Sequence, residues 1–177
     1  APSAVTVTVT KATASVAITT SPASPVLADT ITFTATVTGI SGASAPGGTL
    51  TWTISGSAGA TSCTTTTGPV AGGASDQSLY TCSLTALPAG TYVASATYNG
   101  DSNYLALTAT APTTITIAKL APTITLAEVG TATFNTTLTF TATVVGSLGI
   151  APSNALSNIT WHFGGTAGVG SCTPTTG

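Results

Sequence analysis

The stretch DTITFTATVTG, residues 29–39, alternates apolar and polar side chains over its whole length. Its apolar positions are Ile31, Phe33, Ala35 and Val37, and the positions between them are all threonine. Successive side chains of a β-strand point to opposite faces of the sheet, so this period of two predicts a strand with one buried face. No stretch of the chain shows a convincing helical period, and Gly or Pro interrupts the chain about every ten residues. The sequence therefore predicts an all-β fold of short strands.

The same text returns as TTLTFTATVVG at residues 136–146, which indicates an internal repeat. Three further landmarks return at a similar spacing: Trp52 as Trp161, Cys63 as Cys172, and Lys11 as Lys119. The tryptophan and the cysteine are each displaced by 109 residues. A fixed period of this length predicts tandem domains.

The repeat divides the chain into one complete unit and two partial ones. Residues 1–10, APSAVTVTVT, align with residues 110–119, TAPTTITIAK, and are expected to be the last strand of a preceding unit. Residues 11–118 form the complete unit, and residues 119–177 are expected to be the N-terminal half of a second unit that continues further. The strands predicted in the complete unit span residues 13–20, 30–38, 48–55, 61–67, 77–85, 91–98 and 105–118.

The chain carries very little charge. Only 3% of its 177 residues are charged, against roughly a quarter in an average soluble domain. Lys11 and Lys119 are its only basic side chains, so there is no basic patch for nucleic acid or for an anionic membrane surface. No apolar run approaches the ~20 residues of a membrane helix, so no membrane insertion is expected in this segment.

The three cysteines are Cys63, Cys82 and Cys172. We expect Cys63 and Cys82 to form a disulfide inside the complete unit, with two buried free thiols as the alternative. Cys172 repeats Cys63, so its partner is expected about nineteen residues further on, past the end of this stretch. A disulfide implies an oxidising compartment, and hence a secreted protein.

With these residues placed, the chain resembles the bacterial immunoglobulin-like (Ig-like) domain repeat family of secreted and surface proteins. The likeness rests on ITFTATV and LTFTATV, on GTLTWTI at residues 48–54, and on LPAGTYVASATYNGDSNYLAL at residues 87–107. The positions that match the family's closing signature are Leu87, Gly90, Tyr92, Val93, Ala96, Tyr98, Gly100, Asp101, Asn103 and Tyr104. The cysteine pair is a departure, since many members of the family lack it.

The resemblance implies tandem Ig-like β-sandwich domains of the Greek-key, seven-strand type. Such repeats are typically spacers in large secreted or surface-anchored bacterial proteins. In this fold Trp52 and Trp161 are expected to fill the core beside the disulfide. The less favoured alternative is that they stack on carbohydrate.

The stretch YNGDSNY, residues 98–104, is the most site-like part of the chain. Its alternating oxygen ligands have a spacing found in calcium loops, although such loops usually bring more than one carboxylate. The favoured interpretation is a tight hairpin turn, in which Gly100 adopts a positive φ and Asp101 caps backbone amides. The rings of Tyr98 and Tyr104 would then pack the ends of the turn. The weak candidates for a metal site are Asp101, Asn99 and Asn103.

Lys11 and Lys119 each open a unit. An ion pair between Lys11 and Asp101 is predicted at the junction with the preceding unit, where an exposed pair contributes only ~0–1 kcal/mol. A Lys–Asn isopeptide cross-link is a sharper alternative. It requires a buried lysine and a nearby acid, and it is disfavoured because both lysines lie near linkers.

The threonine ladders suggest ice binding or sugar binding, but threonine is also the neutral polar residue best suited to an exposed strand face. Because threonine occurs on nearly every strand and not on one selected face, the structural interpretation is favoured. The hydroxyls are also candidates for O-linked sugars. Asn135 and Asn158 fit the short N-glycosylation pattern.

His162 lies beside Trp161, with no second histidine, carboxylate or cysteine at ligand spacing. Catalysis requires a nucleophile and a base held together. The sequence therefore predicts no enzyme, no catalytic residue and no cofactor.

Two functions remain. The favoured one is a structural repeat module of an extracellular bacterial surface assembly, with copies of itself or other surface proteins as partners through exposed strand edges. The alternative is a glycan-binding or adhesive accessory module of a larger secreted protein, which would present an exposed aromatic platform. Only 6% of residues are aromatic, and most occupy predicted core positions. Both functions imply a secreted, extracellular protein, and the favoured one places it at the cell surface.

Overall fold

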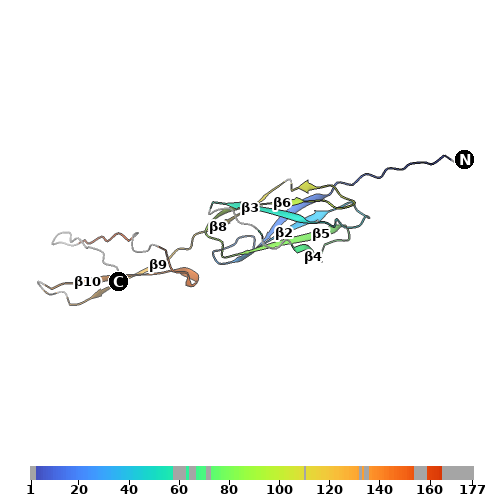
Figure 1. Ribbon diagram of the computed structural model, residues 1–177. Helices are drawn as coiled ribbons and strands as arrows, with labels where there is room; N and C mark the ends of the chain where they lie inside the picture. Colours follow the sequence, from blue (N-terminus) through green and yellow to red (C-terminus); the bar gives the residue numbers. More distant parts are fainter. Residues whose placement is uncertain are drawn as a thin grey trace. The chain divides into compact units, whose positions relative to one another are not determined.

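Ten β-strands and one short 3-10 helix make up the regular structure in the part of the chain that the computed structural model describes (Figure 1). The described residues are 3–57, 63, 67–70, 73–109, 111–131, 133, 136–153 and 159–164. The chain divides into two units, Ala1–Lys119 and Leu120–Gly177. The assignment of residues 1–10 and 119–177 to partial neighbouring units stays a prediction.

Two antiparallel sheets build the first unit. The first sheet has the order β1-β2-β5-β4, with strands β1 (Ser15–Ser21), β2 (Thr30–Thr38), β4 (Thr67–Val70) and β5 (Gln77–Thr85). The second sheet consists of β3 (Leu50–Gly56), β6 (Gly90–Tyr98), β7 (Leu107–Thr108) and β8 (Thr113–Ile117), and β6 pairs with each of the others. This division of strands between two sheets is that of the seven-stranded immunoglobulin sandwich. The predicted fold class is confirmed.

The core lies between the two sheets and is formed by their alternating apolar residues. In β2 the apolar positions are all 0% exposed, namely Ile31, Phe33, Ala35 and Val37. Burial of a side chain such as Phe33 stabilises the fold by about 1.5–3 kcal/mol. From the opposite sheet Trp52 packs on Phe33, with 6.2 Å between the ring centroids. Trp52 therefore occupies the core position that was predicted for it.

Strand positions follow the alternation pattern closely. The predicted strands over residues 30–38 and 77–85 coincide with β2 and β5. The single strand predicted over residues 105–118 is wrong, because the pairing with β6 is interrupted between β7 and β8. Pro112 lies in this interval and has no N–H to donate to a sheet. Most of the strand predicted over residues 61–67 lies outside the described residues.

A disulfide joins Cys63, in the connection between β3 and β4, to Cys82 in β5, with 5.7 Å between the two Cα atoms. Cys82 is buried and lies opposite Phe33 in the pairing of β2 with β5. Cys63 is partly buried against the same core. The bond therefore ties the β3–β4 connection to the first sheet.

The second unit contains an antiparallel strand pair and a short helical turn, namely β9 (Thr123–Val129), β10 (Thr139–Val145) and η1 (Ser147–Gly149). Its pairing repeats that of the first unit: Thr123 lies opposite Val145 where β1 and β2 have Ser15 opposite Thr38. The burial of the apolar side chains, in contrast, differs between the two units. Phe140, which corresponds to Phe33, is 36% exposed.

Three predicted features fall outside the described residues: the glycosylation candidates Asn135 and Asn158, and Cys172. Of the helical segments in the described part, none has the length and apolar character to cross a membrane.

Removal of the disulfide should destabilise the first unit. The bond closes a loop of 19 residues in the unfolded chain, so the double substitution Cys63→Ala, Cys82→Ala should lower the free energy of unfolding by about 3 kcal/mol. Urea denaturation followed by tryptophan fluorescence measures this change. Cys172→Ser is the matched control and should leave the first unit's midpoint unchanged. An equal midpoint for the double variant and the parent chain would contradict the prediction.

Candidate functional site

The loop after β6 is organised by one carboxylate, that of Asp101. Its Oδ1 accepts hydrogen bonds from the backbone N–H groups of Asn103 and Tyr104, each at 2.7 Å. Its Oδ2 accepts from the Gly47 N–H and from the Tyr98 hydroxyl, the latter at 2.9 Å. Asp101 therefore caps backbone amides of its own loop, as predicted, and also reaches the segment that precedes β3.

The four hydrogen bonds hold Asp101 in its ionised form. Burial alone disfavours the charged carboxylate, but the bonds outweigh this effect and lower the pKa of Asp101 below its ordinary value. The partner hydroxyl responds in the opposite sense. Burial, and then the hydrogen bond to Asp101, raise the pKa of Tyr98 far above its ordinary value. Burial and the charge of Asp101 also raise the pKa of Tyr80.

The weak candidates for a metal site do not converge on one point. Asn99 turns its side-chain amide toward β3 and donates to the hydroxyls of Thr49 and Thr51, at 2.9 and 3.1 Å. Both oxygens of Asp101 are engaged with internal donors, and Asn103 lies on a cleft described below. Within the described residues no three His, Cys, Asp or Glu side chains gather as a metal would require.

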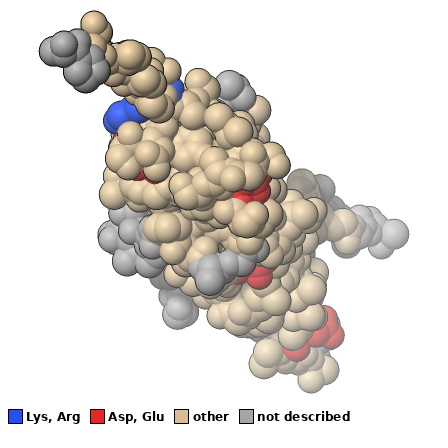
Figure 2. All heavy atoms as spheres, turned by 90° about the vertical axis from the view of Figure 1, so that its right-hand side faces the viewer, with Lys and Arg blue, Asp and Glu red and all other residues tan. Residues whose placement is uncertain are grey.

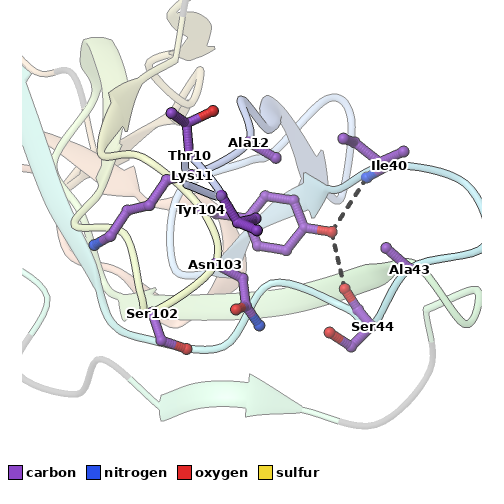
Figure 3. A pocket seen from close by; sticks show the side chains of 10 residues that line it. Thr10, Lys11, Ala12, Ile40, Ala43, Ser44, Ser102, Asn103 and Tyr104 are labelled. Atoms are coloured by element: carbon purple, nitrogen blue, oxygen red, sulfur yellow. Dashed lines mark hydrogen bonds between the residues drawn. The ribbon is translucent and has the colours of Figure 1, made fainter. Parts of the chain in front are cut away.

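Tyr104 fastens the same loop to the segment that follows β2. Its side chain is only 2% exposed. Its hydroxyl donates to the Ser44 carbonyl at 2.9 Å and accepts from the Ile40 N–H at 3.3 Å (Figure 3). A Cβ atom at Gly39 would overlap the tyrosine ring, so the close approach depends on glycine at that position.

Two residues that no sequence motif indicated hold the segment before β3. Ser78 donates its hydroxyl to the Pro46 carbonyl, and Tyr80 donates to the Gly47 carbonyl at 2.9 Å. Both belong to β5, on the opposite sheet. More than thirty residues separate each donor from its acceptor, so only the packing of the sandwich brings them together.

The ion pair predicted between Lys11 and Asp101 is wrong. The Lys11 ammonium donates instead to the backbone carbonyl of Asp101, at 2.6 Å, because the carboxylate is turned toward its four internal donors. The adjacent Ala12 donates its N–H to the Asn103 carbonyl at 2.8 Å, and its carbonyl accepts from the Leu105 N–H at 2.9 Å. Lys11 is exposed, whereas the isopeptide alternative requires a buried lysine.

A cleft of about 410 Å³ opens between this entry segment and two loops, the one after β2 and the one held by Asp101 (Figure 3). The residues that line it are Val9, Thr10, Lys11, Ala12, Ile40, Ala43, Ser44, Ser102, Asn103 and Tyr104. It offers hydroxyls, one amide and one ammonium group for binding. None of these lining residues is His, Cys, Asp or Glu.

Two further residues that the sequence analysis singled out, Trp161 and His162, lie in the second unit. His162 is exposed. Trp161 is partly exposed and stacks on Phe163, with 5.9 Å between the ring centroids, and Phe163 also packs on Phe140 at 5.1 Å. The core position predicted for Trp161 is therefore wrong for the described part of this unit, where no second sheet covers the ring.

The stability of the first unit should depend on pH at both extremes. The lowered pKa of Asp101 contributes stability at pH values above about 3.9, the pKa of an unfolded aspartate, and this contribution is lost as the pH falls below that value. The raised pKa of Tyr98 contributes stability below about pH 10, the pKa of an unfolded tyrosine, and this contribution is lost as the pH rises above that value. Urea denaturation from pH 3 to pH 11 should show a plateau between these limits. Asp101→Asn should lower the plateau by at least about 2 kcal/mol and flatten the acid decline. Asp76→Asn is the control, and an unchanged acid decline in Asp101→Asn would contradict the assignment.

Gly48 and Gly42 provide a matched test of the close packing beneath the Asp101 loop. Both have φ near +80°, but a Cβ at Gly48 would collide with the Gly100 carbonyl, whereas nothing lies within 4 Å at Gly42. Gly42→Ala should therefore cost only the ~1–2 kcal/mol of a left-handed backbone. Gly48→Ala should cost clearly more, measured by thermal and urea unfolding. Equal losses in the two variants would show that the contact with Gly100 has no role.

Comparison with known proteins agrees with this architecture. The family model of the bacterial Ig-like domain (group 3) matches residues 18–118, from β1 to the end of the first unit. No curated protein and no solved structure matches the chain. Domains of the matched family are generally non-catalytic and typically occur in surface or secreted proteins. The match spans more than half of the chain and covers the sandwich described above, and the chain therefore belongs to the bacterial Ig-like domain family, group 3.

Proposed function

We propose that this chain is a structural repeat module of an extracellular bacterial surface assembly, such as a stalk, adhesin, filament or sheath, and that it performs no catalysis. The observation that carries the proposal is that the polar groups of the best-formed site hold the unit's own loops together. Both oxygens of Asp101 accept internal hydrogen bonds, and Tyr104 bonds to backbone groups of a neighbouring loop. Hydrogen bonds of this kind stabilise the fold of the unit.

The outward faces of both sheets carry neutral hydroxyls. Thr32 and Ser83 are hydrogen-bonded across the first sheet at 2.9 Å, and Thr97 and Thr108 across the second at 3.0 Å. Charged side chains are sparse and scattered on the face shown in Figure 2. Neutral surfaces repel one another less than charged ones. This supports copies of the chain, or other surface proteins, as partners.

A glycan-binding or adhesive accessory module, the alternative, would present aromatic rings to a sugar. In the first unit the aromatic side chains are all buried, with none more than 7% exposed: Phe33, Trp52, Tyr80, Tyr92, Tyr98 and Tyr104. The remaining polar feature is the cleft beside Tyr104, whose ring is turned inward. The burial of the rings supports the spacer function over the glycan-binding one.

A replacement experiment in the bacterium that makes this protein tests the proposal. Antibodies against the parent protein should label intact cells. Replacement of residues 11–118 by an unrelated β-sandwich domain of similar length should preserve the labelling and the assembly, because a spacer acts through its length and stiffness. Deletion of the same residues, in contrast, should shorten or disrupt the assembly.

Two results would overturn the proposal. Labelling that requires permeabilised cells would exclude an extracellular location. Loss of assembly or adhesion in the replacement strain, with surface labelling retained, would assign a specific binding role to residues 11–118 and favour the alternative.

A further inference from the structure

The chain enters the first unit at one end and leaves it at the other (Figure 1). At the entry, Ala12 pairs with Tyr104, which lies in the loop that follows β6. At the exit, Ile117 of β8 lies opposite Gly90, the first residue of β6. The nine residues of β6 separate these two points, a length of roughly 27 Å. A pull on the two ends of the unit therefore acts along its strands.

The incoming and outgoing segments also run side by side in the same direction. The bridge between Ala12 and Tyr104 is parallel, in contrast to the antiparallel pairing of all the named strands in the described residues. Further along, the Thr113 hydroxyl at the start of β8 donates to the Ile18 carbonyl of β1 at 3.0 Å. The Lys11 ammonium adds a third contact at the entry end.

Four hydrogen bonds connect these two segments, and we call them the parallel contact. They are the two backbone bonds of the Ala12 bridge, the bond from Lys11 to the Asp101 carbonyl, and the bond from Thr113 to the Ile18 carbonyl. The bond from Lys11 is charge-assisted, the stronger class of hydrogen bond. Lys11 is one of only two basic side chains in the chain, and the repeat places the other, Lys119, at the corresponding position.

Tension loads this contact in shear. A pull draws β1 toward the entry and β8 toward the exit, so the two segments slide past each other. The backbone bonds run across the strands, and they are then loaded together instead of being broken in turn. The seven residue pairs between β1 and β2 and the five between β6 and β8 are loaded in the same way. Resistance to forced unfolding depends on the unfolding barrier, which such simultaneous loading raises.

We propose that the first unit carries tensile load along the chain, and that the parallel contact is its force-bearing part. This inference rests on the proposed function, because only a module linked in series within a surface assembly is pulled from both ends. It goes further, since a spacer has no need to resist tension.

Single-molecule pulling of the full chain, held by handles fused to its two ends, tests the proposal. The disulfide identifies the unfolding steps of the first unit, since it keeps 19 residues from extending. Reduction should lengthen those steps by about 65 Å, at up to ~3.5 Å for each released residue. Cys172→Ser in all chains removes the third thiol from thiol exchange.

Two matched pairs of variants probe the contact itself. Thr113→Val removes the bond to Ile18, and Thr114→Val makes the same change at the next, exposed residue. Lys11→Ala is compared in the same way with Lys119→Ala. Thr113→Val and Lys11→Ala should each raise the unfolding rate of the first unit at a fixed force by about threefold to tenfold, as expected for one lost hydrogen bond. The controls should stay within about twofold of the parent chain.

The direction of pulling distinguishes load bearing from ordinary stability. With the C-terminal handle moved to a peptide inserted at Gly42, in an exposed loop at the entry end, the start of β1 and the end of β2 are pulled apart, so the two strands are peeled from one end. The unfolding rate at the same force should then rise at least about tenfold, because the bonds break in turn. Equal rates in the two directions, or equal effects of Thr113→Val and Thr114→Val, would overturn the proposal. Neither result would affect the spacer function, which the replacement experiment tests separately.

Discussion

The carboxylate of Asp101 joins parts of the first unit that are far apart in the sequence. Its two oxygens accept four hydrogen bonds, from the end of β6, from its own loop, and from Gly47 in the segment before β3. Its backbone carbonyl also accepts the ammonium of Lys11. Each of the four donors helps to stabilise the ionised carboxylate, so the loops at this end of the sandwich depend on one another.

Tyrosine side chains hold several loops of the first unit in place through hydrogen bonds to backbone carbonyls. Each buried tyrosine of the first unit fills part of the core with its ring and uses its hydroxyl to hold a loop. Tyr80 bonds to the Gly47 carbonyl, Tyr92 to the Pro88 carbonyl, and Tyr104 to the Ser44 carbonyl. These loops are therefore fixed without ion pairs, and the surface remains neutral. A neutral surface is consistent with a module that lies close to other proteins in an assembly.

A comparison of the two copies of the repeat distinguishes what the local sequence specifies, the pairing of two strands, from what needs tertiary packing, the burial of their apolar face. The β9–β10 pair has the register of β1–β2, so the alternating sequence is enough to specify the pairing. It is not enough to produce a core: Phe33 is 0% exposed in the first unit, whereas Phe140 is 36% exposed in the second. The difference arises because β3 and β6 cover the first pair, and no strand in the described part of the second unit takes their place. Burial is a property of two sheets together.

Local pattern and repetition predicted the all-β class and the positions of β2 and β5, because each depends on residues close in sequence. They also favoured the Cys63–Cys82 pairing over two free thiols, and the capping role of Asp101 over a metal site. The break between β7 and β8 was also visible in principle, through Pro112. The acceptor of Lys11, the roles of Ser78 and Tyr80, and the parallel bridge between Ala12 and Tyr104 depended on the folded structure alone. In each of these pairs the two groups are more than thirty residues apart, and they meet only because the two sheets pack face to face.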